Sequence, residues 1–308
     1  MKKVSGVKFL FFSRGISKWI WRLITVRRRF SFHPRKQMNI IRQFADCLKT
    51  HDVHGTFFIP AVLLERYVSH LRTIDTKTVE WGIHGFVHTD HSQLEYEQQR
   101  NQISKAVEIF DKCGFKFKGF RCPYLRFNEH TRKVLMGTGR FEFDSSNSII
   151  WEELYGPNQK HYPWIKTFYR ATTYKKNLAV PFLVEQLTEI PVSLPDDDIT
   201  VDRERLSAPE IFNMWSAMLK TCHKNKEVFV LQLHPERFLE LKDVLVPLIK
   251  EAKFLQPSIW ITTLSQVADW QKSNPIGSWP EPYQGAFCIT GDIDAITIKD
   301  FFTRLREW

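Results

Sequence analysis

Long apolar runs, cysteine motifs and internal repeats are absent from this sequence of 308 residues. No run approaches the roughly 20 uninterrupted apolar residues that a membrane-spanning helix needs, and no low-complexity tract or hydrophilic linker divides the chain. The cysteines are scattered, odd in number and without C-x-x-C spacing, which argues against a disulfide framework and a cysteine zinc site. We interpret them as buried or inert thiols in a reducing compartment. They are Cys47, Cys113, Cys122, Cys222 and Cys288.

Acidic residues are absent from residues 1–36, which contain eleven Lys or Arg side chains. The whole chain has a formal net charge of +10, so the remainder is close to neutral. This concentration of charge at one end argues against a nucleic-acid-binding body.

The same segment has helical periodicity, with one apolar face and a basic face. The apolar positions are Ile16, Trp19, Ile20, Leu23 and Ile24. Two interpretations stay open: a helix that lies on anionic lipid headgroups, and a helix that packs on its own domain. Charges interrupt any signal-peptide core and no small-residue cleavage site follows. We therefore expect a cytoplasmic protein, either free or peripheral at the inner face of the membrane.

From about residue 37 onward, helical periods alternate with short apolar runs, which is typical of an α/β fold built from βα units. About seven strands precede the C-terminal region, and the buried run at 286–292 adds another. Helices are predicted at 38–52, 61–71, 93–113, 128–139, 208–224 and 237–254. The region 151–188 is irregular and rich in aromatic residues and proline.

Polar side chains follow most of the predicted strands, which is where catalytic groups collect in βα barrels. These side chains are His84 and His88, Arg121 and Tyr124, Asp144, His234, and Asp292 with Asp294. Two histidines four positions apart can bind one metal ion if the backbone turns helically, and one carboxylate would complete a His₂–carboxylate site.

Each of these residues taken alone has a simpler structural explanation. The acid pair can cap the C-terminal helix, His234 can be a satisfied core histidine, and Arg121 can be an ion-pair partner at the surface. Their joint occurrence at the ends of successive strands is what favours a functional site.

Together the motifs resemble those of the polysaccharide deacetylases, the NodB-homology carbohydrate esterases that remove N-acetyl groups from amino sugars. The matching segments are the acid pair in "GDIDA", the histidine pair in "HGFVH", the "RCPY" loop, Asp144 with downstream Trp151, and His234 in "VLQLHPE". The D-x-D form and the strand "IPVSLP" at 190–195 are most similar to the lipid A-modifying formylarabinose deformylases.

The order of the motifs differs from the usual order of that family, in which the acid-pair strand comes first. Here it comes last, at 286–292. Because the first and last strands of a closed barrel are neighbours, the resemblance implies a circularly permuted, seven- or eight-stranded (β/α) barrel over residues 37–308. Residues 1–36 would form a separate basic segment.

The resemblance also implies roles for the residues. Asp294, His84 and His88 would bind a divalent metal ion, with zinc expected and cobalt, nickel, manganese or iron as alternatives. Asp292 would be the catalytic base and Arg121 its partner, His234 the proton donor and Asp144 the residue that orients it. Pro123, Tyr124 and Trp151 would contact the substrate. An apolar residue separates the two acids, so their roles can be exchanged.

The predicted function is a metal-dependent hydrolase that removes an N-acetyl or similar N-acyl group from an amino sugar. Its substrate would be a surface glycan or a lipid-linked precursor. Two alternatives stay open: a cyclic-amide hydrolase of the same fold, and a glycan- or lipid-binding barrel without catalysis, which would bind no metal.

Overall fold

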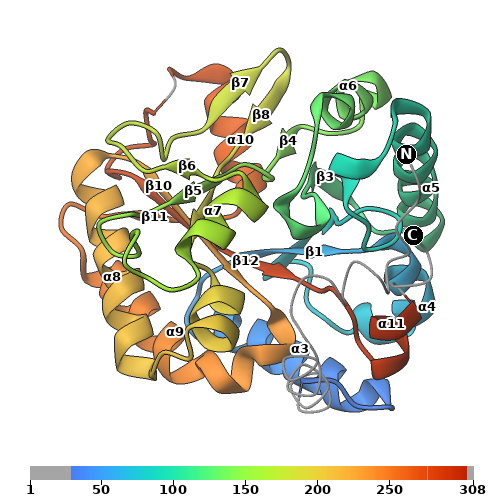
Figure 1. Cartoon of the computed structure of the whole chain (residues 1–308), viewed down its shortest axis with the longest axis horizontal. Helices are drawn as coiled ribbons and strands as arrows, with labels where there is room; N and C mark the ends of the chain where they lie inside the picture. Colours follow the sequence, from blue (N-terminus) through green and yellow to red (C-terminus); the bar gives the residue numbers. More distant parts are fainter. Residues whose placement is uncertain (1–28, 276, 304–308) are drawn as a thin grey trace.

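A largely parallel sheet forms the centre of the structure, a computed structural model that describes residues 29–275 and 277–303 (Figure 1). Its strands are ordered β10-β12-β1-β2-β3-β4-β8-β7, with β11 also paired to β12 and only β7–β8 antiparallel. The strands are β1 (Gly55–Ile59), β2 (Val79–Ile83), β3 (Phe117–Phe120), β4 (Phe143–Asp144), β7 (Phe182–Val184), β8 (Leu187–Glu189), β10 (Val228–Leu233), β11 (Trp260–Ile261) and β12 (Ala286–Asp292).

A second, three-stranded sheet continues the wall of the barrel. It has the order β6-β5-β9, with β5 (Ser148–Ile150), β6 (Thr172–Thr173) and β9 (Val192–Leu194). β5 follows β4 and β9 follows β8 after short connections, and β9 lies alongside β10. The two sheets together make a distorted (β/α) barrel, which confirms the predicted fold class.

The C-terminal strand β12 is an interior strand of the large sheet, second in its order. It pairs in parallel with β1 on one side, where Phe58 is opposite Asp292, and with β10 on the other, where Leu233 is opposite Gly291. All of its residues are buried. Its run of apolar side chains is typical of a strand that is covered on both faces.

Helices surround the sheet, with α8 and α9 on one side and α4 and α5 on the opposite side (Figure 1). They are α3 (Pro34–Thr50), α4 (Ala61–Leu71), α5 (Tyr96–Cys113), α6 (Glu129–Thr138), α7 (Tyr162–Tyr169), α8 (Ala208–Asn225), α9 (Phe238–Phe254), α10 (Leu264–Ser273) and α11 (Ile298–Thr303). Three 3₁₀ turns, η1 (His91–Gln93), η2 (Pro123–Leu125) and η4 (Pro235–Arg237), and a π-helix, η3 (Asp198–Arg203), complete the set in the described residues.

Helix α3 illustrates why these segments are helical. Its apolar side chains repeat every three or four residues, so Ile41, Phe44 and Leu48 are all buried on one face. Helix α5 ends at Gly114, whose φ of 70° gives the left-handed cap that glycine adopts without steric cost.

The predicted helix around residues 16–24 lies outside the described residues. The described part of the basic segment packs on the barrel: Phe30 is buried, Ser31 bridges to Thr297, and α3 begins at Pro34, before the predicted boundary at residue 36. Within residues 29–275 and 277–303, no helix is long and apolar enough to cross a membrane. All five cysteines have free thiols, and four of them are buried.

Candidate active site

Three side chains from two loops converge at the C-terminal end of the sheet. His84 and His88 follow β2, and Asp294 lies two residues beyond β12. One possible ligand atom from each residue lies within 4.8 Å of the others. The Oδ1 atom of Asp294 is 3.0 Å from Nε2 of His88 and 3.6 Å from Nε2 of His84. These are the three residues that the sequence assigned to a metal ion.

The backbone between the two histidines is a bent loop and not a helical turn. Gly85 has a φ of 81°, and a Cβ atom there would lie 3.0 Å from the carbonyl oxygen of Val87. Both constraints favour glycine, because side chains are strained at positive φ. The turn at Gly85 therefore brings the two imidazole rings to a centroid separation of 5.1 Å.

The tautomer of His84 suits a metal ligand. Its Nδ1 atom is 2.8 Å from the carbonyl oxygen of Arg121, which can only accept a hydrogen bond, so Nδ1 carries the proton. The lone pair of Nε2 then faces Asp294. Burial alone would raise the pKa of Asp294, but the neighbouring rings of His88 and His84 hold that pKa well below its ordinary value. A partly buried, ionised carboxylate beside two imidazole nitrogens is a donor set that fits zinc.

The second acid of the pair, Asp292, is bound to Arg121. The Nη1 atom of Arg121 is 2.9 Å from Oδ1 of Asp292, and both side chains are buried. Arg121 also donates to Thr290, to the carbonyl oxygen of Ser145 and to the Ser145 hydroxyl. Its guanidinium group lies over the ring of Phe58 at 4.4 Å. The predicted Arg121–Asp292 pair is therefore present and held from several sides.

His234 follows β10, and its Nε2 atom is 3.8 Å from Oδ2 of Asp294. On the other side of the ring, Nδ1 is 2.7 Å from Oδ1 of Asp197. The backbone N–H of His234 donates to the second oxygen of the same carboxylate at 2.8 Å. Burial would lower the pKa of His234, but the Asp197 carboxylate outweighs it and raises that pKa to about 10.

The prediction that Asp144 orients His234 is wrong, because Asp197 has that position. Asp144 ends β4 and accepts a hydrogen bond from the Ser146 hydroxyl at 2.5 Å. Its register neighbour on β8 is Glu189. Burial is the main reason that the pKa of Asp144 is raised to about 6, and it also raises the pKa of Glu189.

Asp197 is the candidate site residue that sequence reasoning missed. It stands in the run "PDDD" at 195–198, three residues after β9. The search for polar side chains after each strand would have found it at the end of "IPVSLP". Three consecutive acids would still have left open which one contacts His234.

Two of the predicted substrate contacts lie beside the candidate metal ligands. Tyr124 has a φ of 61°, and its ring packs edge-on against His88 with centroids 4.4 Å apart. Pro123 is buried at the start of η2. Trp151 is different: it is 2% exposed and stacks on Tyr174 at 3.7 Å, so the fold uses it as a core residue.

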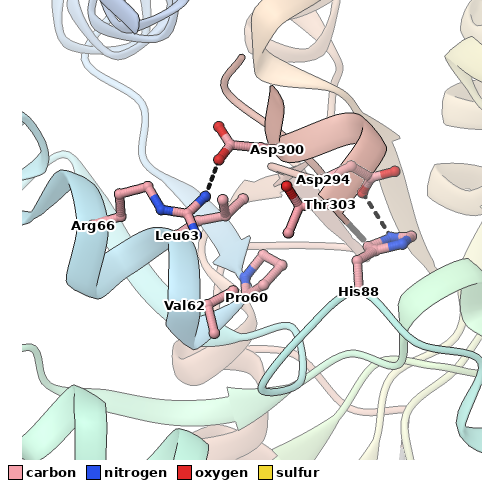
Figure 2. Close-up of a pocket in the computed structure, with 8 residues that line it drawn as sticks. All are labelled: Pro60, Val62, Leu63, Arg66, His88, Asp294, Asp300 and Thr303. Atoms are coloured by element: carbon pink, nitrogen blue, oxygen red, sulfur yellow. Dashed lines mark hydrogen bonds and ion pairs between the residues drawn. The ribbon is translucent and has the colours of Figure 1, made fainter. Parts of the chain in front are cut away.

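A pocket opens on the side of Asp294 that faces α4 and α11. It is lined by Pro60, Val62, Leu63, Arg66, His88, Asp294, Asp300 and Thr303 (Figure 2). His88 and Asp294 lie at one end of this pocket and Arg66 at the other, so a ligand there would contact both ends.

A polysaccharide deacetylase family model matches residues 35–140. This part of the chain is similar to the polysaccharide deacetylase family. It includes His84, His88 and Arg121, and the predicted resemblance is confirmed.

Two curated relatives align with about a third of the chain. A peptidoglycan deacetylase-like protein of Gibberella zeae is 31% identical over 101 residues, which cover 32% of this chain and 30% of the relative. A peptidoglycan-N-acetylglucosamine deacetylase of Bacillus cereus is 27% identical over 104 residues, which cover 33% of this chain and 38% of the relative. The alignments thus span only about a third of these deacetylases.

Solved structures share the fold over most of the chain. One described as a polysaccharide deacetylase from Mycobacterium smegmatis has a TM-score of 0.60 at 21% identity and covers 77% of each chain. The Puue allantoinase has a TM-score of 0.58 at 17% identity and covers 75% of this chain and 71% of its own. At these identities the similarity shows the barrel fold alone.

Proposed function

We propose that this protein is a metal-dependent hydrolase that removes an N-acetyl or similar N-acyl group from an amino sugar. The substrate would be a surface glycan or its lipid-linked precursor. The observation that supports this most is the convergence of His84, His88 and Asp294 between two further groups, the Arg121–Asp292 pair and His234 with Asp197.

His84, His88 and Asp294 would hold the metal ion. When bound, a divalent ion lowers the pKa of a coordinated water molecule and polarises the carbonyl group of the amide. Zinc is the ion we favour, because two imidazoles and one carboxylate leave an open position for water in a tetrahedral site.

Asp292 would accept the proton of the attacking water. Its Oδ1 atom is engaged by Arg121, while Oδ2 accepts no hydrogen bond from the residues that the structure describes. Removal of this proton makes the water a stronger nucleophile toward the amide carbon.

His234 would donate a proton to the departing amine. Because Nδ1 is bound to Asp197, the proton on Nε2 points toward the metal-binding residues. Protonation matters because an amine is a poor leaving group as an anion, and a positioned acid supplies the proton as the C–N bond breaks.

The position of β12 supports a second proposal, that the chain is a circular permutation of the usual deacetylase order. The strand that carries Asp292 pairs directly with β1, although more than two hundred residues separate them in the sequence. We further propose a cytoplasmic, peripheral location, in which residues 1–36 contact anionic lipid. The exposed ring of Phe32, next to Arg35 and Lys36, fits such a contact.

Metal content tests the proposal. Purified wild-type protein should hold about one zinc ion per chain, measured by elemental analysis, whereas Asp294→Ala and His84→Ala should hold little. Glu80→Gln is the matched control, since Glu80 lies in the barrel wall and accepts bonds from Thr56 and Ser265. The loaded protein should then release acetate from N-acetylated glycans.

Absence of metal in the wild type, even after zinc is added back, would contradict the hydrolase mechanism. It would favour the alternative of a binding barrel. Hydrolysis of a cyclic amide without release of acetate from any amino sugar would instead favour the allantoinase-like alternative, whose fold this chain also shares.

A further inference from the structure

The pocket beside Asp294 contains a cation that the mechanism does not use. Pro60, Val62 and Leu63 at the start of α4 supply an apolar wall, and Arg66 lies one turn further along the same helix (Figure 2). The Arg66 side chain is 42% exposed. A guanidinium group therefore lies within the same pocket as the metal-binding residues.

The guanidinium group of Arg66 bonds to one side chain in the described part of the chain. Its Nη1 atom contacts Oδ1 of Asp300, and its Nε and Nη2 atoms bond to no residue in the described part of the chain. Asp300 is also held through its Oδ2 atom, which accepts hydrogen bonds from the Tyr67 hydroxyl and from the backbone and hydroxyl of Thr297, each at 2.8 Å.

The chemistry of this group points to an anionic ligand. Guanidinium groups present five N–H donors in a planar array that matches the oxygens of phosphate or carboxylate. Because Asp300 is buried, its contact with Nη1 of Arg66 is best kept, and the Nε and Nη2 atoms of Arg66 are the donors available to a ligand. The apolar wall formed by Pro60, Val62 and Leu63 can cover the less polar face of the sugar that carries the anion.

We propose that Arg66 binds an anionic group of the substrate, a phosphate or a carboxylate attached to the N-acylated sugar or to its neighbour. This inference rests on the proposed function, because it places the N-acyl group at the metal-binding residues. The phosphate could belong to a lipid-linked sugar, and the carboxylate to an acidic sugar of a glycan. A neutral aminoglycan would not use the site.

The experiment measures binding and acetate release in the zinc-loaded full chain. The probes are N-acetylglucosamine 1-phosphate, N-acetylmuramic acid and neutral N-acetylglucosamine. We expect wild type to bind at least one charged sugar about tenfold more tightly than the neutral one. Arg66→Gln should lose this preference and Arg66→Lys should keep part of it. Arg100→Gln, an exposed arginine on α5 paired with Glu97, is the control for net charge and should change nothing.

Equal affinity for charged and neutral sugars in wild type, or an unchanged preference in Arg66→Gln, would overturn the inference. The charged sugar whose affinity falls more in Arg66→Gln shows whether the site binds a phosphate or a carboxylate. If no sugar releases acetate but the preference still depends on Arg66, the proposed hydrolysis fails and the anion site stands. Thermal unfolding of Arg66→Gln beside wild type tests whether any loss of binding preference comes from a loss of folding.

Discussion

The carboxylate of Asp197 determines which nitrogen of His234 faces the metal-binding residues. It accepts from Nδ1 and from the backbone N–H of the same residue, so the ring has one orientation and one tautomer. In the sequence, Asp144 was the expected partner, yet it lies at the end of β4 against Ser146. Substitution of Asp197 should therefore affect turnover, whereas substitution of Asp144 should affect stability.

Asp197→Asn should lower the turnover number by about 10²–10⁴-fold, because the acid that protonates the amine loses its orientation. Metal content should be unchanged, since Asp197 does not belong to the metal-binding group. Acetate release and elemental analysis of the same preparations check this. A similar loss in Asp144→Asn with full activity in Asp197→Asn would restore the assignment made from the sequence.

Asp144 should instead affect stability through pH. Its pKa is raised to about 6 in the folded state by burial, against about 4 in an unfolded chain. The folded state therefore binds this proton more tightly. Its contribution to stability is full below pH 4 and is lost as pH rises through 6.

Asp144→Asn removes this titration and should raise the free energy of unfolding at pH 7.5 by about 1–3 kcal/mol relative to wild type. The asparagine oxygen can still accept the hydrogen bond of Ser146. The gap should close toward pH 4, as measured by denaturant unfolding across this range. Parallel pH profiles for the two proteins would argue against a raised pKa at Asp144.

At the scale of elements, α11 fixes the loop that carries Asp294. Asp300 accepts hydrogen bonds from Thr297 on its own segment and from Tyr67 on α4, so the two helices are joined across the pocket. The ring of Phe301 packs on Phe30 at 5.8 Å. These contacts position residues 293–297 between β12 and α11.

Asp300→Asn should weaken zinc binding by about tenfold while leaving most of the fold intact, because outer contacts orient a metal ligand. Competition with a metal chelator measures the affinity. Asp111→Asn is a matched control, since Asp111 pairs with Arg140 at the exposed end of α5. An unchanged zinc affinity in Asp300→Asn would show that β12 alone positions Asp294.

Most helices and strands whose apolar residues have a clear period were predictable from the sequence. The elements that were missed have physical causes. Helices α3, α5, α8 and α9 and strand β12 lie close to their expected positions, because their apolar patterns are long. Strands β5 and β6 have three and two residues, too few for a period to show. Their stability comes from pairing with residues that are distant in sequence.

The site was predictable to the extent that its residues follow strands. His84, His88 and Asp294 were found by that rule, and they converge. The pairing of His234 with Asp197 could not be deduced, because it depends on how β9 lies alongside β10. The role of Trp151 was also hidden: an aromatic side chain in an irregular region can face a ligand or the core with equal sequence support.

At the scale of the molecule, the position of β12 predicts that this strand can be placed before β1 in the chain without loss of the site. A variant that places residues 284–303 before residue 29 through a flexible linker, and ends at residue 283, should fold and bind zinc like wild type. The segments already meet, since Ser31 bridges to Thr297. Thermal unfolding and elemental analysis test this, and an unfolded or zinc-free product would show that the present order is required.

The position of β12 also has a consequence for synthesis on the ribosome. β1 emerges with one neighbour, β2, close behind it, but β12 follows only after residue 285. Translation proceeds at roughly 5–20 residues per second. At that rate β12 is synthesised roughly 10–50 s after β1, whereas the delay between β10 and β12 is shorter. During that interval the unpaired edge of β1 is open to wrong pairing. A nascent chain of this protein should therefore depend on chaperones more than one in which the acid-bearing strand is made first.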